Sequence, residues 1–416
     1  MNFIKKYTKE EWSWILNDWG NSAYSLIITT AILPIYFKYV ASNGGLSDID
    51  STAYWGYATA FGTLLISLVA PILGTLADYK GYKKKLFNIF SLCGIIMTFG
   101  LVFVPENNWV ALLLVYIVSH MGFQGSNIFY DGFLVDVTTD KRMDDVSSMG
   151  YGLGYIGSAL LFVVIMLLQI TDGLGIIPVE LVTKVCFILT GIWWLIFTIP
   201  FFKNIRQIHY VEKTGNPLLS SIKRINKTIK DISKHRHIVL FLIAYFFYID
   251  GVDTIFTMAT AVGMDMGIDS NSLILILLLI NTIAFPFTII YGKLAERFGT
   301  RPMIIVAIFV YVLICILALF MQTVTHFLLI GVLVGTSQGG IQALSRSYFA
   351  KIIPKEKANE FFGFYNIFGK FSAILGPIIF GFVTQVTSQI QFGFASLITL
   401  FTIGGLLFIF VKIQVK

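Results

Sequence analysis

Twelve long apolar runs dominate this chain of 416 residues, and each is about as long as the roughly 20 residues that cross a bilayer as a helix. Because backbone groups in lipid must bond to one another, such runs fold as membrane helices. Charged residues make up 13% of the chain against roughly 25% in soluble domains, which excludes an ordinary soluble protein. The sequence predicts an all-α membrane protein with twelve transmembrane helices. We expect them at residues 12–40, 54–78, 85–104, 108–137, 147–169, 181–202, 237–263, 270–295, 301–321, 325–350, 358–385 and 390–412.

The basic residues indicate how the helices are oriented. If both termini are cytoplasmic, 26 of the 30 lysines and arginines fall in the termini or in loops on the cytoplasmic side. Lys38 and Lys184 lie on the other side, and Arg346 and Lys370 lie within helices. Cytoplasmic loops carry such an excess of positive charge. We therefore expect a multi-pass membrane protein with both termini in the cytoplasm. The short loops and minimal termini favour the bacterial inner membrane, a vacuolar membrane being the alternative. The net charge of +7 then needs no nucleic-acid partner.

One long polar connection divides the chain into three expected parts. These are an N-terminal six-helix bundle (1–202), a cytoplasmic linker (203–236) and a C-terminal six-helix bundle (237–416). Within the linker, isoleucines recur at helical spacing and lysines occupy the other faces. This pattern favours an amphipathic helix on the anionic inner leaflet. A solvated linker helix is the alternative.

The two bundles share an internal repeat. The segment Gly74–Asp78, followed by Gly81 and a run of lysines, returns as Gly292–Glu296, followed by Gly299 and Arg301. Both copies follow the second helix of a bundle. An offset of 214 residues also pairs Gln124-Gly125 with Gln338-Gly339 and Tyr151 with Tyr365. Two homologous six-helix halves are therefore expected.

The repeated segments resemble the signature of the major facilitator superfamily, Gly-x-Leu-Ala-Asp-(Arg)-x-Gly-(Arg/Lys)-(Arg/Lys). Other stretches resemble its vacuole effluxer branch, which contains the autophagy-related amino-acid effluxers and bacterial relatives. These stretches are Asn17–Tyr24, Pro34–Phe37, Asp250–Val252, Gln342–Ser347 and Phe362–Lys370. The resemblance spans nearly the whole chain. It implies a secondary transporter whose halves rock around a central site.

Ionisable side chains inside membrane helices need a partner, a water-filled cavity or a proton. Asp250 and Lys370 both lie near the middle of expected helices of one half, and we expect them to pair and to rearrange on binding of substrate or proton. A static salt bridge that fixes helix register is the alternative. Asp253 follows Asp250 by three residues, and two close carboxylates tend to share a proton. We therefore expect Asp131, Asp250 and Asp253 to serve in proton coupling.

Four further charged residues are expected to gate the site. Asp18 and Arg346 have matching depths, so a bond between them would close the cytoplasmic side, with Asp131 or Asp136 as equally good partners of the arginine. Asp78 and Glu296 are expected to face the positive N-terminal ends of helices in the opposite half, near Glu360 and Ser148 respectively.

A set of amide, aromatic and charged side chains is expected to bind the substrate. They suit a small polar solute, most of all amino acids or small peptides, moved by proton-coupled alternating access. An exporter of larger amphiphiles is the alternative, and a non-transporting membrane sensor is the second. The expected substrate-binding residues are Asn21, Tyr24, Gln124, Asn127, Tyr130, Tyr248, Asp250, Gln338, Gln342, Tyr365, Asn366 and Lys370.

Other chemistry is not expected. Gly152–Gly157 matches a dinucleotide-binding pattern, but it lies inside a membrane helix, where such glycines serve helix packing. The histidines and the three cysteines lack metal-site spacing, so no metal is expected. The chain is expected to be no enzyme, to carry no cofactor, and to act as a monomer with a small-molecule solute, protons and the lipid bilayer as its partners.

Overall fold

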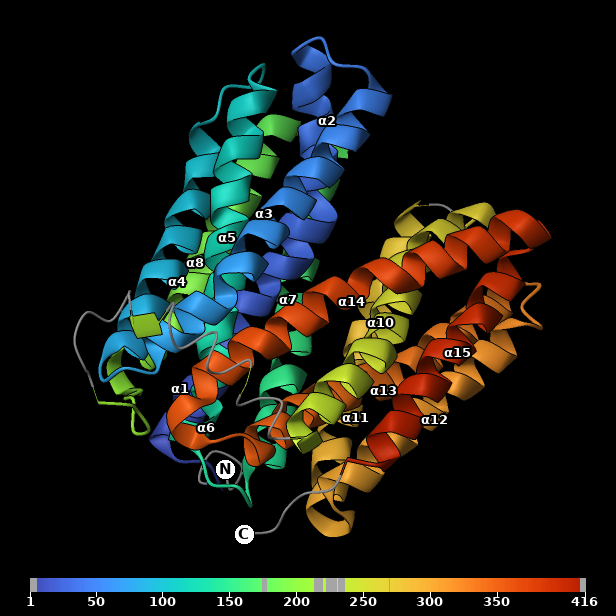
Figure 1. The fold of residues 1–416 in the computed structure, drawn as a ribbon. Coiled ribbons are helices and arrows are strands. Elements are labelled where there is room, and N and C mark those ends of the chain that lie inside the picture. The colour runs from blue at the N-terminus through green and yellow to red at the C-terminus, as the bar shows by residue number, and fades with distance from the viewer. Residues whose placement is uncertain are drawn as a thin grey trace.

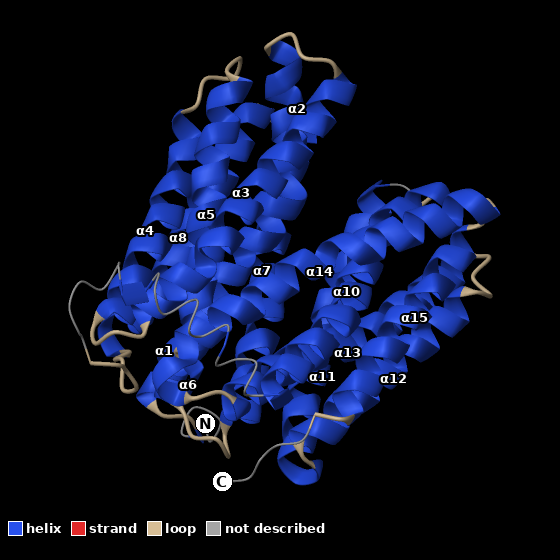
Figure 2. Cartoon of the chain, viewed as in Figure 1, coloured by secondary structure: helices blue, strands red, loops and turns tan. Residues whose placement is uncertain are grey.

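The computed structural model describes residues 6–173, 178–212, 220–221, 230, 236–268 and 270–411. Within these residues, twelve helices are long and apolar enough to cross a membrane, which confirms the predicted fold class. Within each half, short loops join the helices (Figure 2). The elements are α1 (Lys9–Tyr24), η2 (Ser25–Ile32), α2 (Leu33–Asn43), α3 (Asp48–Ala77), α4 (Tyr82–Gly100), η3 (Leu101–Phe103), α5 (Trp109–Gly132), α6 (Leu134–Val137), α7 (Met143–Gly173), α8 (Val179–Asn204), α10 (Arg236–Asp265), α11 (Ser270–Phe298), α12 (Thr300–Ala318), α13 (Val324–Ile352), η4 (Lys355–Lys357), α14 (Ala358–Thr387) and α15 (Ile390–Ile409).

The first membrane crossing is not one regular helix. Between α1 and α2, the segment η2 is a π-helix, and the Thr30 hydroxyl donates to the carbonyl of Ser25 five residues earlier. Wide turns of this kind are frequent at functional sites. The apolar run predicted the crossing, but its periodicity did not indicate the change of pitch.

The helices form two groups that contact each other at one end and diverge at the other (Figure 1). We call α1–α8 the N-terminal half and α10–α15 the C-terminal half. The start of α1 and the end of α15 lie at the end where the halves meet, which we call the terminal end (Figure 1). Across the boundary between the halves, α3 packs on α14, and α7 packs on α11 and α13.

Two glycines of the internal repeat permit these close contacts. A Cβ atom at Gly74 would collide with the backbone carbonyl of Asn359 at the start of α14. A Cβ atom at Gly292 would lie 2.7 Å from the side chain of Ser148 near the start of α7. The two repeats therefore place an α3 or α11 backbone against the first turn of a helix from the other half.

The described part of the linker lies against the repeat of the N-terminal half. The Val211 amide donates to the carbonyl of Asp78 at 2.8 Å, and the Gln207 side chain donates to the carbonyl of Ala77 at 3.1 Å. Most of the expected amphipathic linker helix lies outside the described residues.

Candidate functional site

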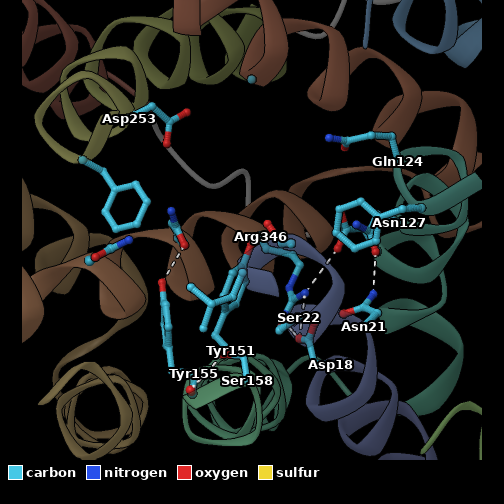
Figure 3. A pocket seen from close by; sticks show the side chains of 18 of the residues that line it. Asp18, Asn21, Ser22, Gln124, Asn127, Tyr151, Tyr155, Ser158, Asp253 and Arg346 are labelled. Carbon is cyan, nitrogen blue, oxygen red and sulfur yellow. Dashed lines mark hydrogen bonds and ion pairs between the residues drawn. The ribbon is translucent and has the colours of Figure 1, made fainter. Parts of the chain in front are cut away.

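A cavity of about 430 Å³ lies between the two halves. Its walls come from α1, η2, α5 and α7 on one side and from α10, α11, α13 and α14 on the other (Figure 3). The polar and charged residues that line it are Asp18, Asn21, Ser22, Ser25, Thr30, Gln124, Asn127, Tyr130, Asp131, Tyr151, Tyr155, Ser158, Tyr245, Asp253, Asn281, Gln338, Gln342, Arg346, Tyr365, Asn366 and Lys370.

Arg346 joins the two halves at this cavity. Its guanidinium lies 3.3 Å from Asp18 and 3.2 Å from Asp131, and it donates to the Ser147 hydroxyl and carbonyl at 3.0 and 3.1 Å. Its side chain is 2% exposed. The expected Asp18 bond and the alternative Asp131 bond thus occur together.

Aromatic rings surround the same guanidinium. It lies 4.6 Å from the ring centre of Trp14, 5.4 Å from that of Tyr130 and 4.2 Å from that of Tyr151. Cations are attracted to such ring faces, most strongly away from water. Two carboxylates, a serine and three rings hold Arg346 in place, so the site is closed at this point.

Nine of the residues expected to bind substrate line the cavity, together with Asp131 and Asp253 of the expected proton-coupling set. Asn21 and Asn127 are joined by a 2.7 Å amide hydrogen bond, and Asp253 and Gln124 enter from opposite sides (Figure 3). The expected binding residues in the wall are Asn21, Gln124, Asn127, Tyr130, Gln338, Gln342, Tyr365, Asn366 and Lys370, and the expected gating residues there are Asp18 and Arg346.

Two expected binding residues lie inside helix contacts instead of the cavity. Tyr24 packs between Phe123 and Trp194, with ring centres 4.8 and 5.2 Å away. Tyr248 is fully buried, and its hydroxyl shares a 2.7 Å hydrogen bond with Ser345. Neither side chain lines the cavity, and each serves packing within one half.

The expected pair of Asp250 and Lys370 is not among the ion pairs of the described residues. Asp250 points into the packing between α10 and α14, where its Oδ1 accepts the Gly376 amide at 2.8 Å. Lys370 instead lines the cavity, where the charges that act on it belong to Asp253 and Asp131. Lys370 therefore lies in the cavity wall as expected, whereas Asp250 faces α14 instead of the cavity.

Several wall residues were missed by the sequence analysis, and one of them bonds across the halves. The Tyr155 hydroxyl of α7 donates to the side-chain oxygen of Gln342 in α13 at 2.9 Å. Tyr151, four residues earlier, faces Arg346. The pairing of Tyr151 with Tyr365 in the repeat was the signal that could have found this face of α7.

At the terminal end, Asp78, which follows the last residue of α3, contacts the first turn of α14. Its Oδ1 accepts the Asn359 amide at 2.9 Å and its Oδ2 accepts the Glu360 amide at 3.2 Å. Such free amides at a helix start attract negative charge. Burial raises the pKa of Asp78 to about 7, although the nearby Lys83 ammonium acts to lower it. The position agrees with the expectation, while its gating role stays a proposal.

Beside this contact, Asp136 connects α6 to Lys83 of α4 and to the linker. Its side chain is 2.7 Å from the Lys83 ammonium and accepts the backbone amides of Ile208 and His209 at 3.1 and 2.8 Å. Burial acts to raise the pKa of Asp136, but Lys83 and His209 hold it below its usual value. Asp136 therefore belongs to the N-terminal half and the linker rather than to Arg346.

Glu296 does not repeat the arrangement of Asp78. It is exposed, and no hydrogen bond or ion pair of its side chain occurs among the described residues. At this place Asp144 of α7 accepts from Thr300 at 2.7 Å, from Ser347 at 2.6 Å and from Lys351 at 2.6 Å. The start of α7 carries its own carboxylate, Asp144, so none is needed from the end of α11.

In the described part of the chain, twelve candidate membrane helices in two halves around a polar cavity form the architecture of the major facilitator fold. The solved structure of the proton:xylose symporter XylE, bound to 6-bromo-6-deoxy-D-glucose, matches with a TM-score of 0.75 at 12% identity, and it covers 97% of this chain and 95% of that chain. That likeness concerns the fold.

Sequence comparison gives the family. A sequence model described as "Vacuole effluxer Atg22 like" matches residues 6–140 and 135–416. The uncharacterized MFS-type transporter YxiO of Bacillus subtilis (strain 168) is 49% identical over 98% of this chain and 96% of its own length. Autophagy-related protein 22 of Kluyveromyces lactis is 24% identical over 83% of this chain and 76% of its own length. The chain belongs to the Atg22-like vacuole effluxer family of MFS-type transporters.

Proposed function

We propose that this transporter moves a small polar solute, amino acids or small peptides first, by proton-coupled alternating access. The observation that carries this proposal is a cavity between the halves that offers charges of both signs. Arg346 with Asp18 and Asp131 closes it toward the terminal end, and the halves diverge at the other (Figure 1).

The charges of the wall favour a solute that carries both an acidic and a basic group. Lys370 makes no ion pair within 4 Å among the described residues, so its ammonium is available to a carboxylate. Asp253 lines the same cavity and is available to an ammonium group. Amides such as Asn366, Gln338 and Gln124 supply the neutral donors and acceptors that fix orientation.

The same charges favour a proton as the coupling ion. Asp18, Asp131 and Asp253 outnumber Arg346 and Lys370 by one, so the empty cavity carries one excess negative charge when all five are ionised. A proton on one carboxylate removes that excess at low cost in a poorly solvated site. Asp131 and Asp253, which line the cavity, are the candidates for this proton, and Asp250, which lies outside the cavity wall, is the third expected proton carrier.

Alternating access would break the contacts at the terminal end. With both termini in the cytoplasm of a bacterium, as the basic loops indicate, the structure is the outward-open state. The inward-open state then requires Arg346 to leave Asp18 and Asp131 while the other ends of the halves come together.

An exporter of larger amphiphiles is the second candidate. Seven aromatic residues line the cavity, which suits apolar groups as well as polar ones. They are Phe123, Tyr130, Tyr151, Tyr155, Tyr245, Phe256 and Tyr365.

Counterflow of labelled solutes in liposomes tests the proposal. The panel contains amino acids, dipeptides, a sugar and an amphiphilic dye. We expect exchange of an amino acid or dipeptide, reduced at least about tenfold by Lys370→Gln, because a desolvated ion pair to substrate contributes more than about 1.4 kcal/mol. Lys293→Gln, at an exposed lysine in the last turns of α11, is the matched control and should exchange normally. Exchange of the dye alone would reject the polar-solute proposal in favour of the second candidate.

A further inference from the structure

Helix α14 is attached to different halves along its length. Near its start, Asn359 and Glu360 bind Asp78 of the N-terminal half, and Gly363 packs directly on Ala70 and Pro71 of α3. Near its end, Phe380 packs on Phe394 of α15 within the C-terminal half, with ring centres 5.1 Å apart. A rocking of the halves must therefore bend α14 or release one of its ends.

The sequence places a weak point between these two attachments. Pro377 has no amide hydrogen, so the helix loses one backbone hydrogen bond and is prone to kink there. Gly376 precedes it, and glycine lowers the cost of altering the backbone. Gly376-Pro377 is thus the place where α14 can bend most easily.

Asp250 of α10 contacts the backbone at this weak point. Its Oδ1 accepts the Gly376 amide at 2.8 Å, and a Cβ atom at position 376 would lie 2.7 Å from the same oxygen and collide with the Thr254 hydroxyl. A larger residue at position 376 would push α10 and α14 apart. The carboxyl group therefore acts on the α14 backbone itself.

The other oxygen of this carboxyl group is unsatisfied. Asp250 is 0% exposed, and neither its Oδ2 nor the Thr254 hydroxyl has a hydrogen-bond partner among the described residues. Asp253, on the same helix, is the charged side chain that acts on it, while α14 contributes the Gly376 amide and α15 contributes Phe401, which packs on Gly251. No described lysine or arginine pairs with Asp250. A negative charge here would be buried without compensation, which is costly.

We propose that Asp250 holds the coupling proton outside the solute cavity and sets the bend of α14 at Gly376-Pro377. In the conformation seen here the carboxyl is neutral, its Oδ1 accepts from Gly376, and its proton on Oδ2 is available to Thr254. When α10 and α14 move apart and water enters, the carboxyl loses the proton and releases the Gly376 amide. This inference rests on the proposed function for its role in transport, but the conformational step itself needs no solute.

The link to the cavity runs along α10. Asp253 lies three residues after Asp250, so the two side chains point about 60° apart on the helix. Asp253 lines the cavity opposite Lys370 of α14, on the side of the hinge that is attached to the N-terminal half. A solute that binds between Asp253 and Lys370 therefore changes the relative position of α10 and α14, the two helices that Asp250 holds together.

Spin-label distances across the diverging end test the conformational step. One label is placed at Asn107, before α5, and one at Gln322, before α13, after replacement of Cys93, Cys186 and Cys315 by serine. Measurements at pH 5 to 8 are made with Asp78→Asn present, because Asp78 is a second buried carboxyl at a contact between the halves. We expect a shift toward the long distance at low pH, and we expect Asp250→Asn to keep the long distance throughout. The matched variant Asp253→Asn should retain the pH-dependent shift.

A full pH-dependent shift in Asp250→Asn would overturn the proposal, whether or not any solute is transported. Where a solute is found, Asp250→Asn should lose uptake driven by a pH gradient at least about tenfold and keep counterflow within about twofold. Equal loss of both would assign Asp250 a structural role and also reject the proposal. If Asp250→Asn does not fold, Pro377→Ala serves instead. It restores a backbone donor, and we expect it to abolish the pH-dependent shift with Asp250 intact; an unchanged shift rejects the hinge.

Discussion

The two contacts that close the terminal end use the same sequence repeat with opposite placement of the acid. In the α3–α14 contact, Asp78 comes from the repeat and binds the free amides at the start of α14. In the α7–α11 contact, the corresponding Glu296 is exposed, and Asp144 on the approaching helix accepts from Thr300, Ser347 and Lys351. Both contacts keep the glycine that allows close approach. The repeat therefore preserves backbone geometry, while the charge that stabilises each contact has moved to a different helix.

Because of this difference, we expect the two contacts to respond differently to pH and to substitution. The α3–α14 contact depends on a carboxyl group whose pKa is shifted toward neutrality by burial. At the α7–α11 contact, Asp144 depends on an ion pair with Lys351 of α13 and on the hydroxyl groups of Ser347 in α13 and Thr300 in α12. All four predictions below are read from spin-label distances between Asn107 and Gln322, which report the population of the conformation seen here.

Asp144→Ala should give the largest effect. It leaves the Lys351 ammonium and two hydroxyl groups without their acceptor in a mostly buried contact, at a cost of about 3 kcal/mol. The population ratio, which is the population of the conformation seen here divided by that of the conformation with a closed diverging end, should fall roughly 100-fold. Asp140→Ala is the matched control, because it breaks an exposed bond between the halves, to Lys355, worth about 0 to 1 kcal/mol. Equal effects of the two variants would contradict the importance of Asp144.

Gly74→Ala should come next and should exceed Gly292→Ala. The new methyl group collides with the backbone carbonyl of Asn359 in the first case and lies 2.7 Å from the Cβ and Oγ atoms of Ser148, a milder overlap, in the second. Overpacking of this kind costs about 1 to 3 kcal/mol, with the larger value where the overlap with backbone is deeper. The reverse order would show that the α7–α11 contact is the less adaptable of the two.

Lower pH should stabilise the α3–α14 contact. The pKa of Asp78 is raised to about 7 here, whereas an exposed aspartate has a pKa of about 3.9, so the closed contact binds an additional proton between these values. The contribution is complete below about pH 4 and is lost as the pH rises toward 7. Raising the pH from 6 to 7.5 should reduce the population ratio about tenfold. Asp78→Asn, measured together with Asp250→Asn, should remove this dependence; a persistent slope would assign it to another group.

The sequence predicted the helices and much of the cavity because both depend on local patterns. Apolar runs mark the crossings, and polar residues such as Gln124, Asn127 and Arg346 are costly in lipid, so they must face a cavity or a partner. The faces of Asp250 and Tyr24 could not be predicted in this way. Asp250 lies in α10, which is apolar nearly all round, so no hydrophobic stripe separates cavity from packing there. Tyr24 is the last residue of α1, directly before η2, where the helix changes pitch and the spacing no longer indicates the face. The π-helical turn of η2 carries no signal in residue periodicity either.

The placement of Glu296 is the clearest case in which symmetry misled the prediction, and it gives the smallest expected effect. The repeat equates Glu296 with Asp78, but Asp144 and Asp145 already supply negative charge at the start of α7, so a third carboxylate there would be repelled. Glu296→Gln should therefore change the conformational equilibrium by less than about 0.5 kcal/mol, as for other exposed side chains. Glu296→Gln combined with Asp144→Asn sharpens the comparison. If Glu296 can act at the start of α7 as Asp78 acts at the start of α14, Glu296→Gln should shift the conformational equilibrium more strongly once Asp144 is neutral. Additive effects of the two substitutions would show that Glu296 does not contribute to the α7–α11 contact.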